Sequence, residues 1–130
     1  MIRLLAAAAL LLAGGAIALA EPMPSGSPGA RAYQKCYACH SLAPGQNDLS
    51  GPTLHGIVGR PVAAEPGFAY SPALTRFAAG RVWDMALLDR MIADPEGLVP
   101  GTAMAFHGIA DPADHQALIA WLAGPAEAQR

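Results

Sequence analysis

The five residues Cys36-Tyr37-Ala38-Cys39-His40 constrain this chain more than any other segment. They hold the only 2 cysteines of the sequence, and a histidine directly follows the second one. Two thiols at this spacing can form thioether bonds to the two vinyl groups of a haem, and the histidine can then bind the iron. The motif therefore predicts one covalently attached haem c, held by Cys36 and Cys39, with His40 as an iron ligand.

Three other uses of such a cysteine pair stay open at this point. Zinc takes four ligands, and the sequence offers no second cysteine pair to complete a zinc site. A thioredoxin-like redox pair normally lies in a βαβ setting, which this sequence does not suggest. A structural disulfide would close an unusually short ring. We expect the haem, and the rest of the chain favours it further.

Residues 1–20 have the pattern of a secretory signal peptide. A basic start with Arg3 precedes an apolar run over residues 4–19, and Ala18-Leu19-Ala20 fits a cleavage site. The run is shorter than the roughly 20 apolar residues that span a bilayer, and an uncleaved membrane anchor is the alternative. Export to the periplasm also suits the cysteines, because free thiols pair in an oxidising compartment.

The rest of the chain is long enough for one small domain. We expect a flexible leader at residues 21–28, the haem domain at residues 29–124 and a C-terminal tail at residues 125–130. The formal net charge of the whole chain is −2, which disfavours nucleic acid as a partner.

Caps and apolar spacing predict helices joined by long loops, with no strand. The expected helices cover about 29–36, 72–77 after Ser71, the residues from Asp84 to just before Pro95, and about 112–122 after Asp111. Loops 41–70 and 95–110 are rich in Gly and Pro, and such long loops are unusual in a small domain unless a large group fills its centre. The sequence therefore predicts an all-α domain built around a haem.

A second iron ligand is expected on the opposite side of the haem. Met104 is the best candidate, because the turn-rich segment 99–106 can bring its thioether to the iron. Met85 and Met91 better fit the buried face of a helix, where methionine fills gaps in the core. The histidines expected at polar or surface positions instead are His55, His107 and, facing solvent on the last helix, His115.

Further motifs follow the cysteine segment along the chain. They are Gly51-Pro52-Thr53-Leu54-His55-Gly56-Ile57-Val58-Gly59-Arg60, Gly67-Phe68-Ala69-Tyr70, Trp83, Pro100-Gly101-Thr102-Ala103-Met104 and Leu118-Ile119-Ala120-Trp121-Leu122. In this order and spacing the chain resembles the class I cytochromes c over about residues 29–123, and the mitochondrial cytochromes c and bacterial cytochromes c2 look most similar. The resemblance implies the class I cytochrome c fold, with three to five helices and long loops wrapped around one covalently bound haem.

The resemblance also implies a role for each matching residue. Cys36 and Cys39 would carry the thioether bonds, and His40 and Met104 would be the two axial ligands of the iron. The Pro52 carbonyl would accept a hydrogen bond from the His40 ring, which fixes the orientation of the imidazole. The residues implied to bond the haem propionates are Arg60, Tyr70 and Trp83, with Thr102 bonding a propionate or orienting the axial sulfur.

Packing between the first and last helices is a further implication, with Gly29 and Tyr33 against Leu118 and Trp121. Glycine at such a crossing lets two backbones approach closely.

The chain departs from the family pattern near the expected distal ligand. Met91 replaces a tyrosine of the family and Leu74 an asparagine, so we expect a drier pocket with fewer donors around the sulfur. Met91 also offers a second thioether that can compete for the iron. Ala103 stands where lysine is common, and Lys35 is the only lysine of the chain, so charge steering toward acidic partners should be weak.

The function implied by the resemblance is single-electron transport, not catalysis. We expect a monomeric periplasmic carrier with His/Met ligation that takes electrons from a bc1-type complex or a dehydrogenase and passes them to an oxidase or reductase. One alternative is a dedicated haem subunit of a periplasmic dehydrogenase complex. The other is a haem enzyme or gas sensor in which Met104 is a labile ligand.

Overall fold

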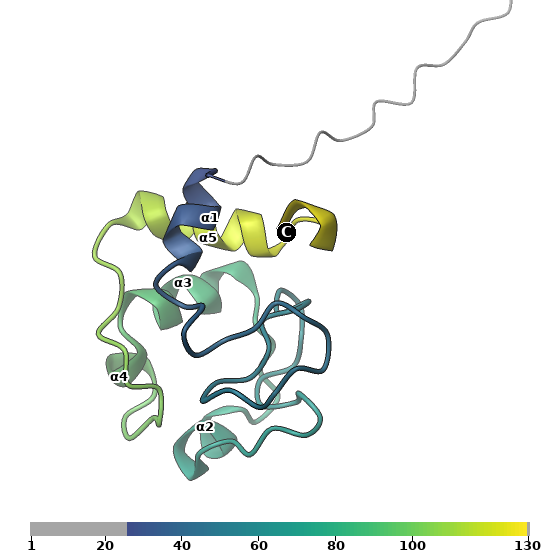
Figure 1. Cartoon of the computed structure of the whole chain (residues 1–130). Helices are drawn as coiled ribbons and strands as arrows, with labels where there is room; N and C mark the ends of the chain where they lie inside the picture. The colour runs from purple at the N-terminus through teal and green to yellow at the C-terminus, as the bar shows by residue number, and fades with distance from the viewer. Residues whose placement is uncertain (1–25, 130) are drawn as a thin grey trace, which may run out of the picture.

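The fold is a set of helices joined by long loops, as a computed structural model shows for residues 26–129 (Figure 1). The signal peptide and most of the leader expected from the sequence lie outside these described residues. The helices are α1 (Pro28–Tyr33), α2 (Pro72–Phe77), α3 (Met85–Ala93), α4 (Pro95–Leu98), α5 (Pro112–Leu122) and the 3-10 helix η1 (Ala126–Gln129). The β structure within this range is one isolated bridge between Pro61 and Val82, so the prediction of an all-α class is confirmed.

Three predicted helices begin at the residues that the sequence indicated. The Ser71 hydroxyl accepts a hydrogen bond from the amide of Leu74, and α2 follows. Asp84 caps α3 in the same way, and Asp111 caps α5, with Pro112 in its first turn. A proline there loses no hydrogen bond, since the first amides of a helix have no partner within it.

The ends of two other segments differ from expectation. α1 begins at Pro28, is capped by the buried Ser27 and ends at Tyr33, short of the cysteine motif. α4 was not expected at all, because Asp94-Pro95 was interpreted only as the stop of α3. Asp94 also caps a new turn, since its carboxylate accepts a hydrogen bond from the Gly97 amide at 2.9 Å.

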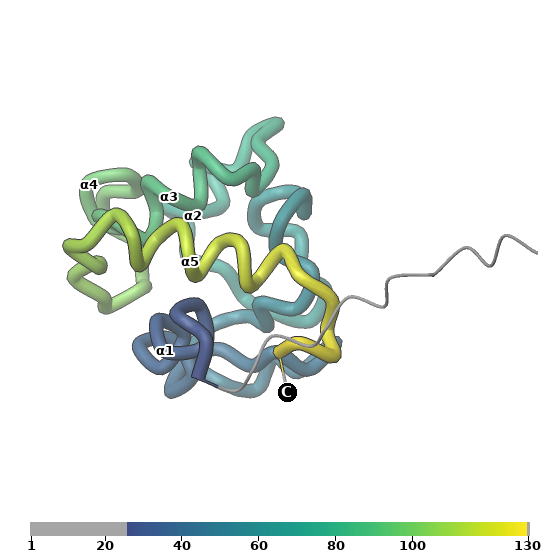
Figure 2. The backbone as a smooth tube through the Cα atoms, turned by 90° about the horizontal axis from the view of Figure 1, so that it is seen from above, coloured from purple at the N-terminus to yellow at the C-terminus, as the bar shows by residue number. Residues whose placement is uncertain are grey.

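The first and last helices pack against each other, as the resemblance implied (Figure 2). A Cβ at Gly29 would lie 2.2 Å from the Cβ of Trp121, so only glycine allows this crossing. The rings of Tyr33 and Trp121 are 5.2 Å apart between centroids. Residues 125–130, expected to be a tail, also pack on α5. The Trp121 indole donates a hydrogen bond to the Ala128 carbonyl in η1.

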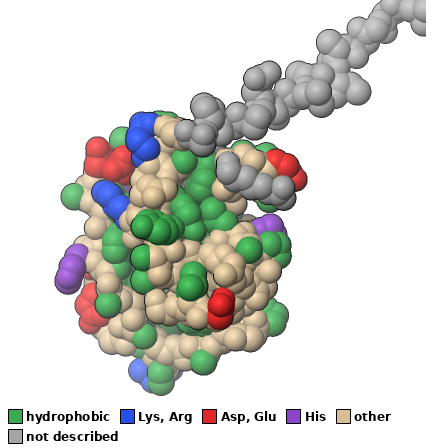
Figure 3. Space-filling model, viewed as in Figure 1, with side chains coloured by type: hydrophobic (Ala, Val, Ile, Leu, Met, Phe, Trp, Pro, Cys, Tyr) green, Lys and Arg blue, Asp and Glu red, His purple; other side chains and the backbone are tan. Residues whose placement is uncertain are grey.

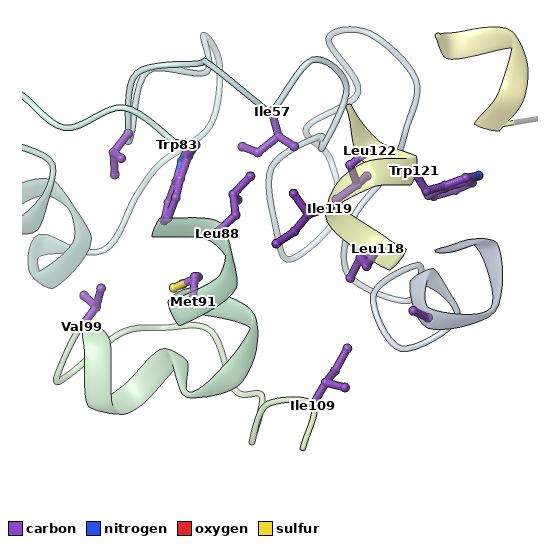
Figure 4. Close-up of a cluster of buried hydrophobic side chains, with 12 residues drawn as sticks. Ile57, Trp83, Leu88, Met91, Val99, Ile109, Leu118, Ile119, Trp121 and Leu122 are labelled. Atoms are coloured by element: carbon purple, nitrogen blue, oxygen red, sulfur yellow. The ribbon is translucent and has the colours of Figure 1, made fainter. Parts of the chain in front are cut away.

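The buried core draws mainly on α3 and α5, with further residues from α1 and from the loops before and after α3 (Figure 4). Met91 lies in this core, as predicted, whereas the prediction for Met85 was wrong, since its side chain is 56% exposed at the first position of α3. The prediction for His115 was also wrong, because this side chain is 4% exposed and its two ring nitrogens face the Asp89 carboxylate and the Ile109 carbonyl. None of the helices between residues 26 and 129 is long and apolar enough to cross a membrane.

Candidate haem site

The two cysteines lie in a tight turn directly after α1. The amides of Cys39 and His40 both donate hydrogen bonds to the Cys36 carbonyl at 3.0 Å, which brings the motif into one compact turn. Both thiols are free, with Cys36 half-buried and Cys39 exposed. Burial, with a smaller contribution from Cys39, raises the pKa of Cys36 to about 11. Cys36 is therefore a neutral thiol at neutral pH, which can lie against an apolar surface without burying a charge.

The His40 ring is held by a hydrogen bond through one of its two nitrogens. Its Nδ1 lies 2.7 Å from the carbonyl oxygen of Pro52, the contact that the resemblance implied. A carbonyl only accepts, so Nδ1 carries the ring proton and Nε2 keeps its lone pair. Burial lowers the pKa of His40; the bond to Pro52 opposes this effect and the Arg60 guanidinium adds to it. A neutral imidazole with a free Nε2 is the form that binds iron.

The backbone of Gly51 lies directly against the His40 ring. A Cβ at this position would be 2.4 Å from the ring Cε1 and 2.7 Å from Nδ1. The amide of Gly51 also donates a hydrogen bond to the Cys39 carbonyl at 2.8 Å, and the Tyr33 hydroxyl donates one to the His40 carbonyl at 2.6 Å. The imidazole is thus fixed by the hydrogen bond of its ring to Pro52, and the backbone next to it is fixed at Cys39 and at His40 itself. Sequence reasoning did not give Gly51 a role of its own.

Arg60 lies at the centre of a polar network in the loop that follows. Its guanidinium donates hydrogen bonds to the carbonyls of Thr53 at 2.9 Å and His55 at 3.1 Å. It also forms a salt bridge with Glu65 at 3.0 Å, in which the side chains are only 13% and 12% exposed. Its Nε is buried and has no hydrogen-bond partner within the described part of the chain. A buried donor of this kind fits an anionic acceptor such as a haem propionate.

Tyr70 and Trp83 lie close to Arg60 and are connected to it through Glu65 and the backbone. The Tyr70 hydroxyl accepts a hydrogen bond from the Glu65 amide at 3.2 Å, so its own proton is free to donate. Burial raises the pKa of Tyr70, which keeps the phenol protonated. The Trp83 amide donates to the Arg60 carbonyl at 2.9 Å, and the indole is 7% exposed. Three potential donors to a carboxylate therefore come from one connected region.

Glu65 is the residue of this network that sequence reasoning missed. Its second carboxylate oxygen accepts a hydrogen bond from the Asn47 amide group at 3.0 Å. Asn47 in turn accepts one from the Thr53 amide at 2.9 Å, which connects the two ends of the loop. An isolated glutamate in a loop gives no signal in the sequence, since its partners lie 5 and 18 residues away.

Met104 lies in a turn that Thr102 organises. The Thr102 hydroxyl accepts a hydrogen bond from the Met104 amide at 3.2 Å, and the Thr102 amide donates to the Val99 carbonyl at 3.0 Å. The Phe106 amide donates back to the Met104 carbonyl at 2.9 Å. The Met104 side chain is partly buried and packs against the core cluster that contains Met91. Two thiols, a neutral imidazole, a thioether and an unpartnered buried donor together fit a covalently bound haem.

Replacing Arg60 by methionine is expected to lower the free energy of unfolding by about 3–5 kcal/mol, because it leaves the Glu65 charge buried and unpaired. Replacing Glu65 by methionine as well removes that charge, so the double variant should be more stable than Arg60→Met alone. Urea unfolding of the two single variants and the double variant measures this coupling. Equal stability of Arg60→Met and the double variant would contradict it.

Several known proteins are similar to this chain over most of its length. A cytochrome c2 from Rhodomicrobium vannielii is 35% identical over 116 residues, which cover 89% of this chain and 88% of the relative. Cytochrome c2 iso-1 from Magnetospirillum molischianum is 43% identical over 93 residues, covering 70% of this chain and 90% of the relative. No family model matches the chain.

Among solved structures, cytochrome cH from Methylobacterium extorquens is similar at a TM-score of 0.67 and 40% identity. The match covers 74% of this chain and 94% of that protein. The fold, the cysteine-histidine turn and these relatives agree with one another. The chain belongs to the cytochrome c2 group of class I monohaem cytochromes c, which are electron carriers with one covalently bound haem c and not enzymes.

Proposed function

We propose that this chain is a periplasmic single-electron carrier in which Cys36 and Cys39 would hold the haem and His40 and Met104 would bind its iron. The haem, when bound, supplies an iron that alternates between the ferrous and ferric states. The observation that carries the ligand assignment is the hydrogen bond from His40 Nδ1 to Pro52 at 2.7 Å, since it leaves Nε2 free for iron. The signal-peptide pattern of residues 1–20 supports export.

The other residues of the site orient the ligands and exclude water. Gly51 and Pro52 restrict rotation of the His40 ring, which would hold the imidazole in one orientation toward the iron. Arg60, Tyr70 and Trp83 offer donors to the propionates, so that these carboxylates can be buried. A thioether ligand and an apolar surround both favour the ferrous state and raise the potential.

The proposed partners are redox proteins on either side of the carrier. A bc1-type complex or a dehydrogenase would be the donor and an oxidase or reductase the acceptor, with the chain acting as a monomer. Transient contacts between electron carriers are typically small, which suits repeated binding and release.

An absorption spectrum of the exported protein tests this proposal. We expect a c-type reduced spectrum, the far-red band of sulfur-ligated ferric haem, and no change when carbon monoxide is added to the reduced protein. Rapid carbon monoxide binding without the far-red band would instead favour the haem enzyme or sensor. Stoichiometric co-purification with a dehydrogenase would favour the dedicated subunit.

Weak charge steering is a second expectation for the carrier. Positive side chains are sparse and scattered on the face in Figure 3. The single lysine, Lys35, lies next to Cys36 and pairs with Asp114 at 3.9 Å. The rate of electron transfer to an acidic oxidase should therefore change less than about threefold between roughly 0.01 and 0.15 M ionic strength. Over this range the Debye length falls from about 30 to about 8 Å.

Ala103→Lys is the matched variant for this measurement. It adds one positive charge beside the proposed ligand Met104, at an exposed position, and should make the rate fall more steeply with salt. A steep fall in the unmodified protein would contradict the expectation.

A further inference from the structure

Glu65 is a charged residue of the haem site to which the proposed function gives no role. Its side chain lies in the loop between Arg60 and Tyr70 and is only 12% exposed. One carboxylate oxygen accepts a hydrogen bond from Nη1 of Arg60 at 3.0 Å, and the other accepts one from the Asn47 amide group at 3.0 Å. Both oxygens therefore have donors inside the protein, as a buried carboxylate requires.

Glu65 is joined to two of the residues that are implied to bond the propionates. Its side chain holds Arg60, and its backbone amide donates a hydrogen bond to the Tyr70 hydroxyl at 3.2 Å. Burial, the largest effect, raises the pKa of Tyr70, the Glu65 amide and the Arg60 charge lower it, and the Glu65 charge raises it again. The charges of Arg60 and Glu65 thus both act on a group that is implied to contact a propionate.

Arg60 has a donor left for a second anion. Its Nη1 donates to Glu65 and to the His55 carbonyl, and its Nη2 donates to the Thr53 carbonyl. Its Nε is buried and has no hydrogen-bond partner among the residues that the structure describes. With a propionate at Nε, Arg60 would be the shared cation of two carboxylates. One positive charge cannot offset two negative ones, so a net negative charge would remain at this site.

We infer that Glu65 lowers the reduction potential of this carrier, because it takes part of the Arg60 charge and leaves a net negative charge beside the haem. Ferric iron carries one positive charge more than ferrous iron, so a fixed negative charge nearby favours the ferric state. Water and salt screen a buried charge much less than an exposed one. The inference rests on the proposed function for the placement of a propionate at Arg60 and Tyr70.

The experiment compares the midpoint potentials of the unmodified haem-loaded protein and Glu65→Gln by redox titration at neutral pH. Glutamine keeps the size of the side chain and removes its charge. We expect the ratio of ferrous to ferric protein at a fixed applied potential to increase about tenfold, which is about 59 mV for one electron. An increase of less than about twofold, or a decrease, would overturn the inference.

Glu65→Asp separates the charge of this residue from its shape. Aspartate keeps the charge on a shorter side chain, so it should lower the midpoint of thermal unfolding but change the ferrous-to-ferric ratio by less than about twofold. A purely structural role would affect the potential of both variants. Equal shifts of the potential in Glu65→Asp and Glu65→Gln would therefore count against a role of the charge.

Asp48→Asn is the matched control for a charge outside the buried network. It removes one negative charge from an exposed position, next to Asn47 in the sequence. Its effect on the potential should be smaller and should disappear at about 1 M salt, where the Debye length is about 3 Å. The shift in Glu65→Gln should remain at this salt concentration, and its disappearance would show that Glu65 does not act as a buried charge.

A second measurement uses the unmodified protein and keeps the inference testable if Glu65→Gln is poorly folded. The carbon-13 chemical shift of the Glu65 carboxyl in the haem-loaded ferrous protein reports whether this group is ionised. We expect the shift of a carboxylate at neutral pH. The shift of a protonated carboxyl would contradict the inference, because a neutral Glu65 adds no negative charge to the site.

Failure of the inference can be distinguished from failure of the proposed function. A missing far-red band in the unmodified protein would overturn Met104 as ligand, whereas the comparison at Glu65 needs only the covalently bound haem. A far-red band in both proteins, with the same potential in Glu65→Gln as in the unmodified protein, would leave the ligands in place and overturn the role of Glu65.

Discussion

Replacing Met104 by alanine should abolish the far-red band and let carbon monoxide bind the reduced protein within the mixing time. The midpoint potential should fall by more than about 0.1 V, a fraction of the roughly 0.8 V range that axial ligands set. The reason is that the thioether is the proposed sixth ligand and favours the ferrous state, and alanine leaves that position to water. Redox titration and carbon monoxide binding measure both effects.

Met85→Ala is the matched control, because it removes a thioether whose side chain is 56% exposed on α3. It should leave the band, the potential and the carbon monoxide response unchanged. Met91 provides a sharper test of ligand choice, since it is buried in the cluster against which Met104 packs. If the band survives in Met104→Ala and disappears only when Met91 is also replaced, Met91 is a competing ligand and the assignment of Met104 as the single sulfur ligand is wrong.

Gly51→Ala should be one of the most destabilising single-methyl changes in the chain. The new Cβ would lie 2.4 Å from the His40 ring, which cannot turn away without losing its hydrogen bond to Pro52. Overpacking costs about 1–3 kcal/mol, and we expect the upper end of this range. The midpoint of thermal unfolding of the haem-loaded protein should fall by roughly 10–20 °C for a domain of this size.

Gly124→Ala makes the same substitution at a glycine with no positive φ, and its nearest new contact is the Trp121 carbonyl oxygen at 3.2 Å. Its effect on thermal unfolding should be clearly smaller. Comparable losses in the two variants would mean that the close approach of Gly51 to His40 is not the cause.

Local patterns were sufficient for most of the helices. Ser71, Asp84 and Asp111 cap helices where predicted, because a cap and the first turn it serves lie within three residues of each other. The same locality explains the error at Asp94-Pro95, since one residue pair can end a helix and also begin the next. The roles of the two cysteines and His40 could likewise be predicted from the sequence, because one short motif contains all three.

The site could be predicted residue by residue only where a motif marked it. Pro52, Arg60 and Tyr70 were named from the resemblance, but Glu65 was not, although it holds Arg60 and Asn47 together. A residue's partners across a loop depend on how the loop closes, which single positions in the sequence do not show. Gly51 was matched as part of a motif, and its contact with the His40 ring emerged only in three dimensions.

The sequence by itself determined the helical class, the capped starts of α2, α3 and α5, and the motif that contains Cys36, Cys39 and His40. These features depend on neighbours along the chain. The tertiary structure alone decided that His115 is buried and Met85 exposed, contrary to expectation. His115 meets Asp89, which is 26 residues away, only because α3 packs on α5, and burial of a side chain depends on which surfaces the folded chain brings together.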